Sequence, residues 1–225
     1  AFAGDTLVVG AYRDHLAAGQ PGSPDGEGSV HLFRPAGAGW EHYRALRGGL
    51  HAGRGDNFGF ALAATPELIV VGAPGAAQLV DNALQPESGV GFVFRRSGDT
   101  WIDDGRLQSE AGAAAVGSRF GDHVIVNGST IACTAPYEVI PGATARGAVY
   151  VFDRIGVEWV LAAKLTSPRP EATFNFGIGV ALDGDHLLGL SHDVGEPLAE
   201  PGGLLEQALG LDGVEHGQRG RARHR

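Results

Sequence analysis

Apolar and polar positions alternate along short stretches of this 225-residue chain, and glycine-containing turns separate these stretches. The segments LIVVGAP (68–74) and GVGFVF (89–94) combine β-branched and aromatic residues, which is typical of β-strands. Between such segments lie Gly, Asn and Asp, the residues that accept positive φ in tight turns. The pattern therefore predicts an all-β protein.

The strand segments belong to a repeat, because three stretches of the chain align without gaps. They read GSVHLFRPAGAGWEHYRAL, GVGFVFRRSGDTWIDDGRL and GAVYVFDRIGVEWVLAAKL, and they begin at Gly28, Gly89 and Gly147. In each, Phe follows the glycine after five residues, Trp after seven more and Leu after another six. All the tryptophans of the chain occupy this register: Trp40, Trp101 and Trp159.

A second half-unit precedes the first along the chain. Its copies are FGFALAATPELIVVGAP, FGDHVIVNGSTIACTAP and FGIGVALDGDHLLGLSH, which start at Phe58, Phe120 and Phe176. The opening AFAGDTLVVGAY aligns with the middle of this half-unit. We therefore expect the chain to start inside a repeat and to be a fragment of a longer protein.

Each full unit of about 55–60 residues contains four predicted strands, which is the signature of a β-propeller blade. We expect about 3.5 repeats of an incomplete propeller. They are blade 1 (1–50, first strand truncated), blade 2 (51–110), blade 3 (111–168), the start of blade 4 (169–193) and a divergent tail (194–225). Glycines after Phe and in VGAP let backbones approach each other, and Phe and Trp fill the space between blades.

The segments FGFALA, LIVVGAP and GVGFVF together resemble the FG-GAP repeat of integrin α-chain propellers and bacterial surface or secreted proteins. The spacing GxVYVF-x6-W is most similar to the bacterial version, and the resemblance covers roughly residues 3–192. Phe58-Gly59 with Gly72-Ala73-Pro74 matches fully, Thr134-Ala135-Pro136 lacks one glycine, and Leu190-Ser191-His192 departs. The resemblance implies a seven-bladed propeller, of which about three blades are missing, and an extracellular or cell-surface location.

Integrin members of the family bind Ca²⁺ through an Asp-rich loop between the first two strands of certain blades. The corresponding connections here, AATPE, IVNGST and ALDGDH, lack the alternating oxygen ligands that such a site needs. Asp183 and Asp185 alone fall short of six oxygens, so we expect no Ca²⁺ there. In the variable loop 12–28, Asp14, Asp25 and Glu27 leave a Ca²⁺ site open as an alternative, although we favour a solvated loop.

No other stretch indicates a catalytic or metal-binding site. The segment DGDHLLGLSHD (183–193) has two His and three Asp, but the spacing of its histidines is not that of a helical zinc motif. His15, His31, His42 and His51 fall at unmatched positions and are predicted to be surface residues. Cys133, the single cysteine, is predicted to be a small buried apolar residue. We therefore expect no catalytic, cofactor-binding or metal-binding residues and no enzyme.

The tripeptide Arg54-Gly55-Asp56 matches the adhesive motif that integrins recognise. It precedes Phe58-Gly59 with only Asn57 between them, and Ser118-Arg119 precedes Phe120-Gly121 in the next unit. We therefore interpret it as part of the turn that enters a blade, with Asp56 capping that turn.

Composition narrows the function further. Apolar residues make up 43% and charged residues 19% of the chain, which fits a globular core. The net charge of −9 argues against a nucleic-acid partner. No apolar run approaches the roughly 18 residues of a membrane span.

The repeat pattern stops after Asp193, and the tail contains LLEQALGL, which looks like a short helix. A frame error or truncation in the gene is the favoured interpretation. The alternative is a natural ending with a capping helix at 204–210 and a basic, disordered tail. Open blade edges would then be aggregation-prone or covered by self-association.

We expect a non-enzymatic scaffold of a secreted or cell-surface protein that binds a protein or glycan through inter-strand loops. One alternative is a non-catalytic propeller module of a larger secreted hydrolase, which the neighbouring reading frames would reveal. A propeller lectin is a weaker hypothesis, because the loops supply only Tyr12 and Tyr137 as aromatic residues.

Overall fold

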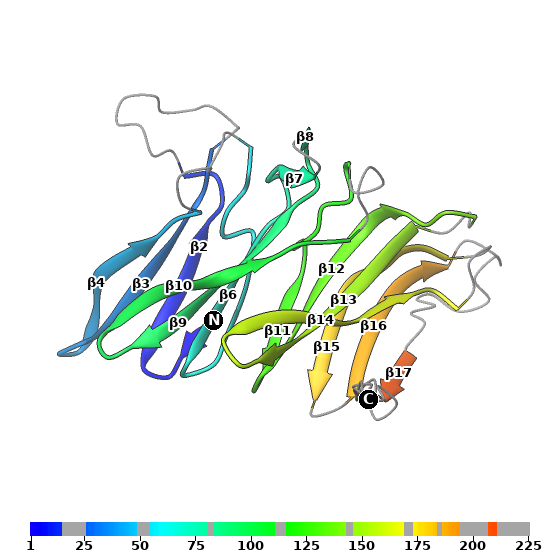
Figure 1. Ribbon diagram of the computed structural model, residues 1–225. Coiled ribbons are helices and arrows are strands. Elements are labelled where there is room, and N and C mark those ends of the chain that lie inside the picture. Colours follow the sequence, from blue (N-terminus) through cyan, green and yellow to red (C-terminus); the bar gives the residue numbers. More distant parts are fainter. Residues whose placement is uncertain are drawn as a thin grey trace, which may run out of the picture.

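The computed structural model describes residues 1–14, 26–48, 55–80, 83–110, 116–142, 146–168, 173–183, 186–193 and 207–210. In this part of the chain every regular element is a β-strand. The strands form four antiparallel sheets that follow one another along the molecule, from the blue first sheet to the orange last one (Figure 1). A separate small hairpin completes the fold.

The strands divide among the sheets in chain order. The first blade contains β1 (Phe2–Ala3), β2 (Thr6–Ala11), β3 (Ser29–Ala36) and β4 (Gly39–Leu46). The second contains β5 (Ala61–Ala64), β6 (Leu68–Ala73), β9 (Val90–Ser97) and β10 (Thr100–Leu107). The third contains β11 (Val124–Asn127), β12 (Thr130–Val139), β13 (Arg146–Ile155) and β14 (Glu158–Thr166). The fourth sheet contains β15 (Thr173–Asp183), β16 (His186–Asp193) and β17 (Gln207–Gly210).

Each of the first three sheets is a four-stranded antiparallel meander, as the repeat predicted. Within the described residues the sheets do not close into a ring, so the fold is an incomplete β-propeller. The sequence pattern missed one element, the hairpin of β7 (Gln78–Val80) and β8 (Ala83–Gln85) in the variable loop of the second blade.

Consecutive blades are joined where the glycine of GxVYVF meets the Phe-Gly of the next unit, a contact that we call the blade junction. A Cβ on Gly28 or Gly89 would lie 2.1 or 1.9 Å from the carbonyl oxygen of Phe58 or Phe120, respectively. Both glycines also have positive φ, 86° and 78°. The Phe120 amide donates to the carbonyl of Ser88 at 2.9 Å. Only glycine therefore fits at these positions.

The glycine of the GAP motif makes a second backbone contact at the same junction. A Cβ on Gly72 would lie 2.0 Å from the Gly121 carbonyl oxygen, and one on Gly10 would lie 2.1 Å from that of Gly59. The sequence prediction that these glycines permit close backbone approach is confirmed.

Apolar side chains fill the space between blades. Phe58, Phe120 and Phe176 are each at most 2% exposed and centre three successive cores. Phe120 packs edge-on against Tyr150 and Phe152, with ring centroids 5.4 and 6.1 Å apart. These phenylalanines are core residues, as predicted.

Two tryptophans form hydrogen bonds to the outer strand of the preceding blade. Trp101 Nε1 donates to Tyr43 Oη at 3.3 Å, and Trp159 Nε1 donates to Asp104 Oδ2 at 3.3 Å. Arg96 and Arg154 lie over the respective indole rings, 5.2 and 5.3 Å from the ring centroids. A repeated arginine–tryptophan pair therefore connects the outer strands.

Trp40 does not follow this pattern, and its predicted core role is wrong. It is 48% exposed and contacts the ring of Phe2, itself 59% exposed, at 6.0 Å. The position of the stacking arginine is occupied by Pro35. The physical reason is that no described blade covers this face of the first blade. Self-association through such open faces stays a prediction.

The helix expected at 204–210 is wrong where the structure describes it. Gln207–Gly210 form β17, which pairs antiparallel with β16. A strand edge offers the backbone of this segment a ladder of hydrogen bonds, and this tertiary pairing overrides the helical preference of Gln, Ala and Leu. No described helix is long and apolar enough to cross a membrane.

The blade junction generates a stability prediction. Gly89→Ala should destabilise the protein by about 3 kcal/mol or more, because overpacking against the Phe120 carbonyl adds roughly 1–3 kcal/mol to the cost of positive φ. Chemical denaturation measures the loss.

Gly98→Ala is the matched control. Gly98 also has positive φ, 60°, but no atom lies within 4 Å of its added Cβ. It should cost only about 1–2 kcal/mol. Equal losses in the two variants would contradict the close approach at the junction.

Candidate functional site

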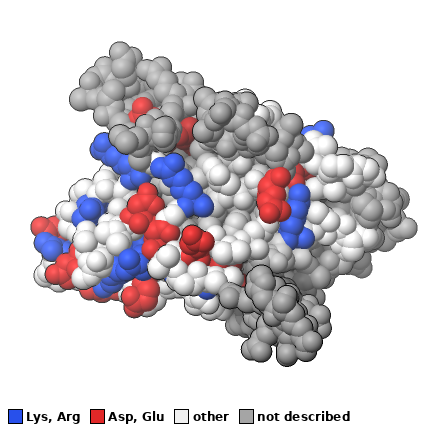
Figure 2. Space-filling view, viewed as in Figure 1, with Lys and Arg blue, Asp and Glu red and all other residues white. Residues whose placement is uncertain are grey.

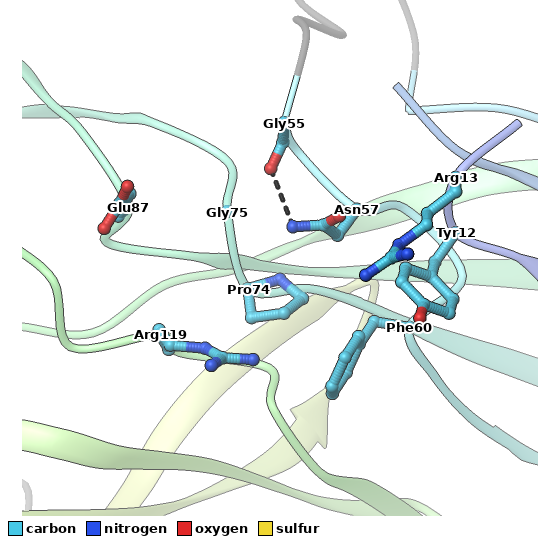
Figure 3. A pocket seen from close by; sticks show the side chains of 9 residues that line it. All are labelled: Tyr12, Arg13, Gly55, Asn57, Phe60, Pro74, Gly75, Glu87 and Arg119. Atoms are coloured by element: carbon cyan, nitrogen blue, oxygen red, sulfur yellow. Dashed lines mark hydrogen bonds between the residues drawn. The ribbon is translucent and has the colours of Figure 1, made fainter. Parts of the chain in front are cut away.

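A pocket of about 490 Å³ opens where loops of the first three units meet. It lies among the segment that follows β2, the segment that follows β6, and the segments that precede β5, β9 and β11 (Figure 3). Its lining residues are Tyr12, Arg13, Gly55, Asn57, Phe60, Pro74, Gly75, Glu87 and Arg119. Loops held on a rigid scaffold are the usual place for binding sites, so this pocket is the candidate functional site.

Arg119 occupies a backbone conformation that disfavours its side chain. Its φ is 56°, and the residues at the same place in the neighbouring units, Asn57 and Asn175, have φ of 57° and 54°. Asn tolerates this left-handed region, whereas a long side chain there costs free energy. Strain of this kind gathers at functional sites, which singles out Arg119 within the repeat.

The Arg119 guanidinium is held between two aromatic rings. It lies 5.4 Å from the Phe60 ring centroid and 5.5 Å from that of Tyr137, and it pairs with Asp122 at 2.7 Å. Phe60 and Tyr137 are 39% and 38% exposed. The three groups therefore present a preorganised cation at the surface.

A second cation continues this row on the other side of Phe60. Tyr12 meets Phe60 edge-on, with ring centroids 5.4 Å apart, and Arg13 lies over the Tyr12 ring at 5.3 Å. Figure 3 shows Phe60 between Tyr12 and Arg119. Two cations and three rings thus form one connected series of contacts, and we call Arg13, Tyr12, Phe60, Arg119 and Tyr137 the arginine–aromatic row.

The row offers recognition chemistry. Stacked guanidinium groups keep N–H edges that form paired hydrogen bonds with a carboxylate, and the rings provide apolar contact. The acidic side chain of Glu87 also lines the pocket. The visible face of the molecule carries acidic and basic side chains interspersed, so the cations act locally (Figure 2).

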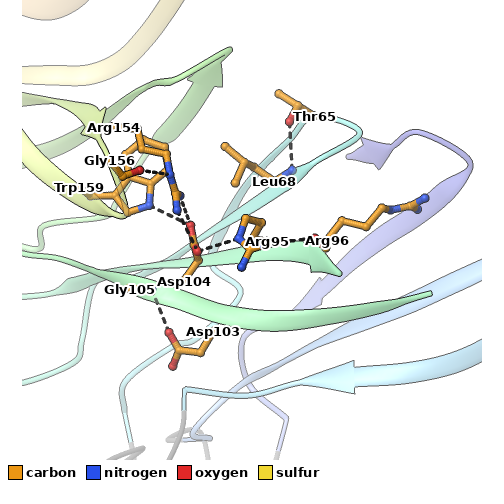
Figure 4. Close-up of polar contacts among 10 residues, drawn as sticks. All are labelled: Thr65, Leu68, Arg95, Arg96, Asp103, Asp104, Gly105, Arg154, Gly156 and Trp159. Atoms are coloured by element: carbon orange, nitrogen blue, oxygen red, sulfur yellow. Dashed lines mark hydrogen bonds and ion pairs between the residues drawn. The ribbon is translucent and has the colours of Figure 1, made fainter. Parts of the chain in front are cut away.

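Another charged cluster, between the second and third blades, is structural. The side chain of Asp104 is 7% exposed and accepts hydrogen bonds from Arg154, from Arg95 Nε at 3.0 Å and from Trp159 Nε1 at 3.3 Å (Figure 4). Burial alone would raise the pKa of Asp104, but the hydrogen bonds from Arg154, Arg95 and Trp159 outweigh it and the pKa is lowered. This cluster joins β10 to β13 and β14.

A buried acid in the third blade is equally inaccessible. The Glu138 side chain is 1% exposed, accepts from Tyr150 Oη at 2.6 Å and pairs with Lys164 at 2.5 Å. Burial, together with the hydrogen bond to Glu138, raises the pKa of Tyr150. The group therefore serves packing and polar satisfaction in the core.

The predicted turn role of the Arg-Gly-Asp segment is tested only in part. Arg54 lies outside the described residues. Gly55 accepts a hydrogen bond from the side chain of Asn57 at 2.8 Å, and the Asp56 carbonyl accepts from the Gly75 amide at 3.1 Å. The capping role of the Asp56 side chain stays a prediction.

The structure tests the prediction about the Cys133 thiol, but it describes only some of the residues in the metal predictions. Cys133 is fully buried, as predicted, and burial raises the pKa of its thiol. Asp25, Asp185, His15 and His51 lie outside the described residues. Asp183 and His192 lie in described strands, but their side chains are not described. Among the residues that the structure describes, no three His, Cys, Asp or Glu side chains cluster for a metal.

Two groups of side chains meet in the fold without a sequence signal that joins them. Phe60 and Arg119 were not recognised as partners of Tyr12, because they lie in different units and meet only in the fold. His42 is exposed, as predicted, and His31 is half-buried, but the sequence did not indicate that their ring nitrogens lie 3.1 Å apart. A sequence signal for Arg119 does exist, because the residue before Phe-Gly is arginine in this unit and asparagine (Asn57, Asn175) in two others.

Comparison with known proteins does not assign the chain to a family. No model of a known protein family matches the chain, and no curated protein is significantly similar to it.

The cluster at Asp104 generates a pH prediction. A carboxylate whose folded pKa is lowered stabilises the protein above its unfolded pKa, and this contribution is lost as pH falls through the folded value. Asp104→Asn should therefore cost about 1–2 kcal/mol at pH 7. The difference from wild type should shrink below about pH 4.

Denaturation of wild type and variant across pH checks this. Glu158→Gln, which removes an exposed carboxylate from neighbouring β14, is the control and should change stability little at either pH. A loss at Asp104 that does not depend on pH would contradict the charge-based account.

Proposed function

We propose that this chain is part of a non-enzymatic FG-GAP-type β-propeller scaffold of a secreted or cell-surface protein, which binds a protein or glycan through its inter-strand loops. The repeat motifs support the family and the location. The four-stranded blades support a scaffold, because they hold loops of separate units at fixed positions.

The observation that carries the proposal is Arg119. It occupies a left-handed position where the neighbouring units have Asn57 and Asn175, and it is stacked between Phe60 and Tyr137. A cation kept in a strained backbone and flanked by exposed rings serves recognition better than stability. Its planar N–H edge matches a carboxylate, which acidic glycans and acidic protein side chains both carry.

The pocket size supports a ligand group of limited extent. About 490 Å³ lies within the range of small-ligand sites and accommodates a sugar residue or one to two side chains of a protein loop. The arginine–aromatic row runs beyond the pocket to Tyr137, which extends the contact surface along the loops.

Arg119→Asn tests the proposal. The change relieves the strained backbone but removes the ion pair with Asp122, whose side chain is 11% exposed, so stability should fall by about 1–3 kcal/mol and the variant should stay folded. Binding to defined glycan and peptide arrays, quantified by biolayer interferometry on the hits, should weaken at least about tenfold. Phe60→Ala should weaken it as well, since the stacked ring that orients Arg119 is lost.

Arg34→Gln is the matched control. Arg34 is an exposed arginine that pairs with Glu41 on the outer hairpin of the first blade, away from the pocket. It should leave binding unchanged. The proposal is overturned if wild type binds neither array, or if Arg119→Asn binds as wild type does.

A further inference from the structure

Two histidines of the first blade, distant from the arginine–aromatic row in sequence, face each other on neighbouring strands. His31 lies on β3 and His42 on β4, and their rings are tilted at 52° with centroids 5.1 Å apart. The closest approach joins His31 Nδ1 to His42 Nε2 at 3.1 Å. The bulge between Leu32 and Phe33 shifts the strand register at this place.

The other nitrogen of His31 is held by a buried serine. Ser29 Oγ donates to Asp14 Oδ2 at 2.6 Å, so it accepts a hydrogen bond from His31 Nε2 at 2.9 Å. Ser29 is 1% exposed, and Asp14 also lies 3.5 Å from His31 Nε2. This chain places the His31 proton on Nε2 and leaves the Nδ1 lone pair directed toward His42.

The first blade departs from its repeat at the positions that build this arrangement. Where Ser29 stands, the other units have Val90 and Ala148. The aromatic residues Phe92 and Tyr150 occupy the place of His31, and Asp103 and Leu161 occupy that of His42. Phe92 and Tyr150 are buried between blades, whereas His31 retains 31% exposure of its side chain. At the position of His31 an imidazole thus replaces a buried aromatic residue, and Ser29 places a hydroxyl beside it.

We propose that His31 Nδ1 and His42 Nε2 form a two-nitrogen chelate for a divalent transition-metal ion, with Ser29 and Asp14 as its supporting shell. Two imidazole nitrogens at about 2.0–2.1 Å from a tetrahedral ion are separated by roughly 3.3 Å, close to the distance observed. A metal-bound histidine normally donates its other ring N–H to a carboxylate or hydroxyl, as His31 does. Solvent completes the coordination.

Binding requires a tautomer change but no net loss of protons from the neutral rings. With the His31 proton on Nε2, the 3.1 Å contact without metal is a hydrogen bond from His42 Nε2–H to His31 Nδ1. With metal, the His42 proton resides on Nδ1 and both facing nitrogens give their lone pairs to the ion. Imidazole ligands favour Cu²⁺ over Ni²⁺ and Zn²⁺, so copper binds most tightly.

Titration of the full chain with CuCl₂ and ZnCl₂ tests the proposal, with calorimetry for stoichiometry and tryptophan fluorescence for location. Trp40 lies two residues from His42 on β4, on the same face of the sheet. Cu²⁺ at the chelate should therefore quench Trp40, and this component should disappear in Trp40→Phe. Wild type should bind one more equivalent than His42→Gln.

Two repeat-based variants separate ligands from support. His31→Phe installs the residue of the second unit and should abolish the same equivalent. Ser29→Ala installs the residue of the third unit and should weaken that equivalent by about 10–100-fold without removing it. His123→Gln, which removes a histidine beside Asp122 in the third blade, should change none of these readouts.

Circular dichroism confirms that each variant is folded before titration. Equal stoichiometry and affinity in wild type, His42→Gln and His31→Phe would overturn the proposal and leave the two rings as a hydrogen-bonded pair. Quenching that persists in both histidine variants would do the same.

Discussion

The fold depends on one steric constraint, the contact of bare backbone with bare backbone between consecutive blades. At each blade junction a carbonyl oxygen of a Phe-Gly segment lies where the Cβ of any residue but glycine would be. Main-chain atoms therefore set the distance between blades. The side chains of the blade faces pack into the space that this distance leaves. The same contact brings the segments before β5 and β11 beside the segments after β2 and β6, which assembles the pocket.

Polar groups supplement this contact at the outer strands. The arginine–tryptophan pairs and the Asp104 cluster satisfy buried donors and acceptors at the rim, where the apolar cores end. These hydrogen bonds and ion pairs orient the strands but add little to the free energy of folding, because charged groups in partly solvated places gain little net free energy. They add directional contacts between the outer strands of neighbouring blades, while apolar burial supplies most of the stability.

The repeat made the blades predictable, because strand alternation, turn glycines and aromatic spacing are local signals. Phe58, Phe120 and Cys133 are buried as expected for the same reason. The β7–β8 hairpin escaped prediction because it lies in the one segment that varies between units. Trp40 and Gln207–Gly210 differ from expectation because tertiary neighbours, absent in one case and present in the other, determine their environment. The arginine–aromatic row and the facing histidines depend on contacts between distant segments, which no local pattern encodes.

The junction between the third and fourth blades shows that one side of the contact tolerates a side chain. Where the first two junctions oppose two glycines, here Thr134 faces Gly177, and the Cβ of Thr134 lies 3.2 Å from the position that a Cβ of Gly177 would take. One bare α-carbon per contact is thus enough, provided that it is the one after phenylalanine. The one side chain at these paired positions, that of Thr134, lies on the second strand, and the residue after phenylalanine is glycine at all three junctions. The second strand of a blade can therefore accept a small side chain at this position while the backbones of the two blades stay in contact.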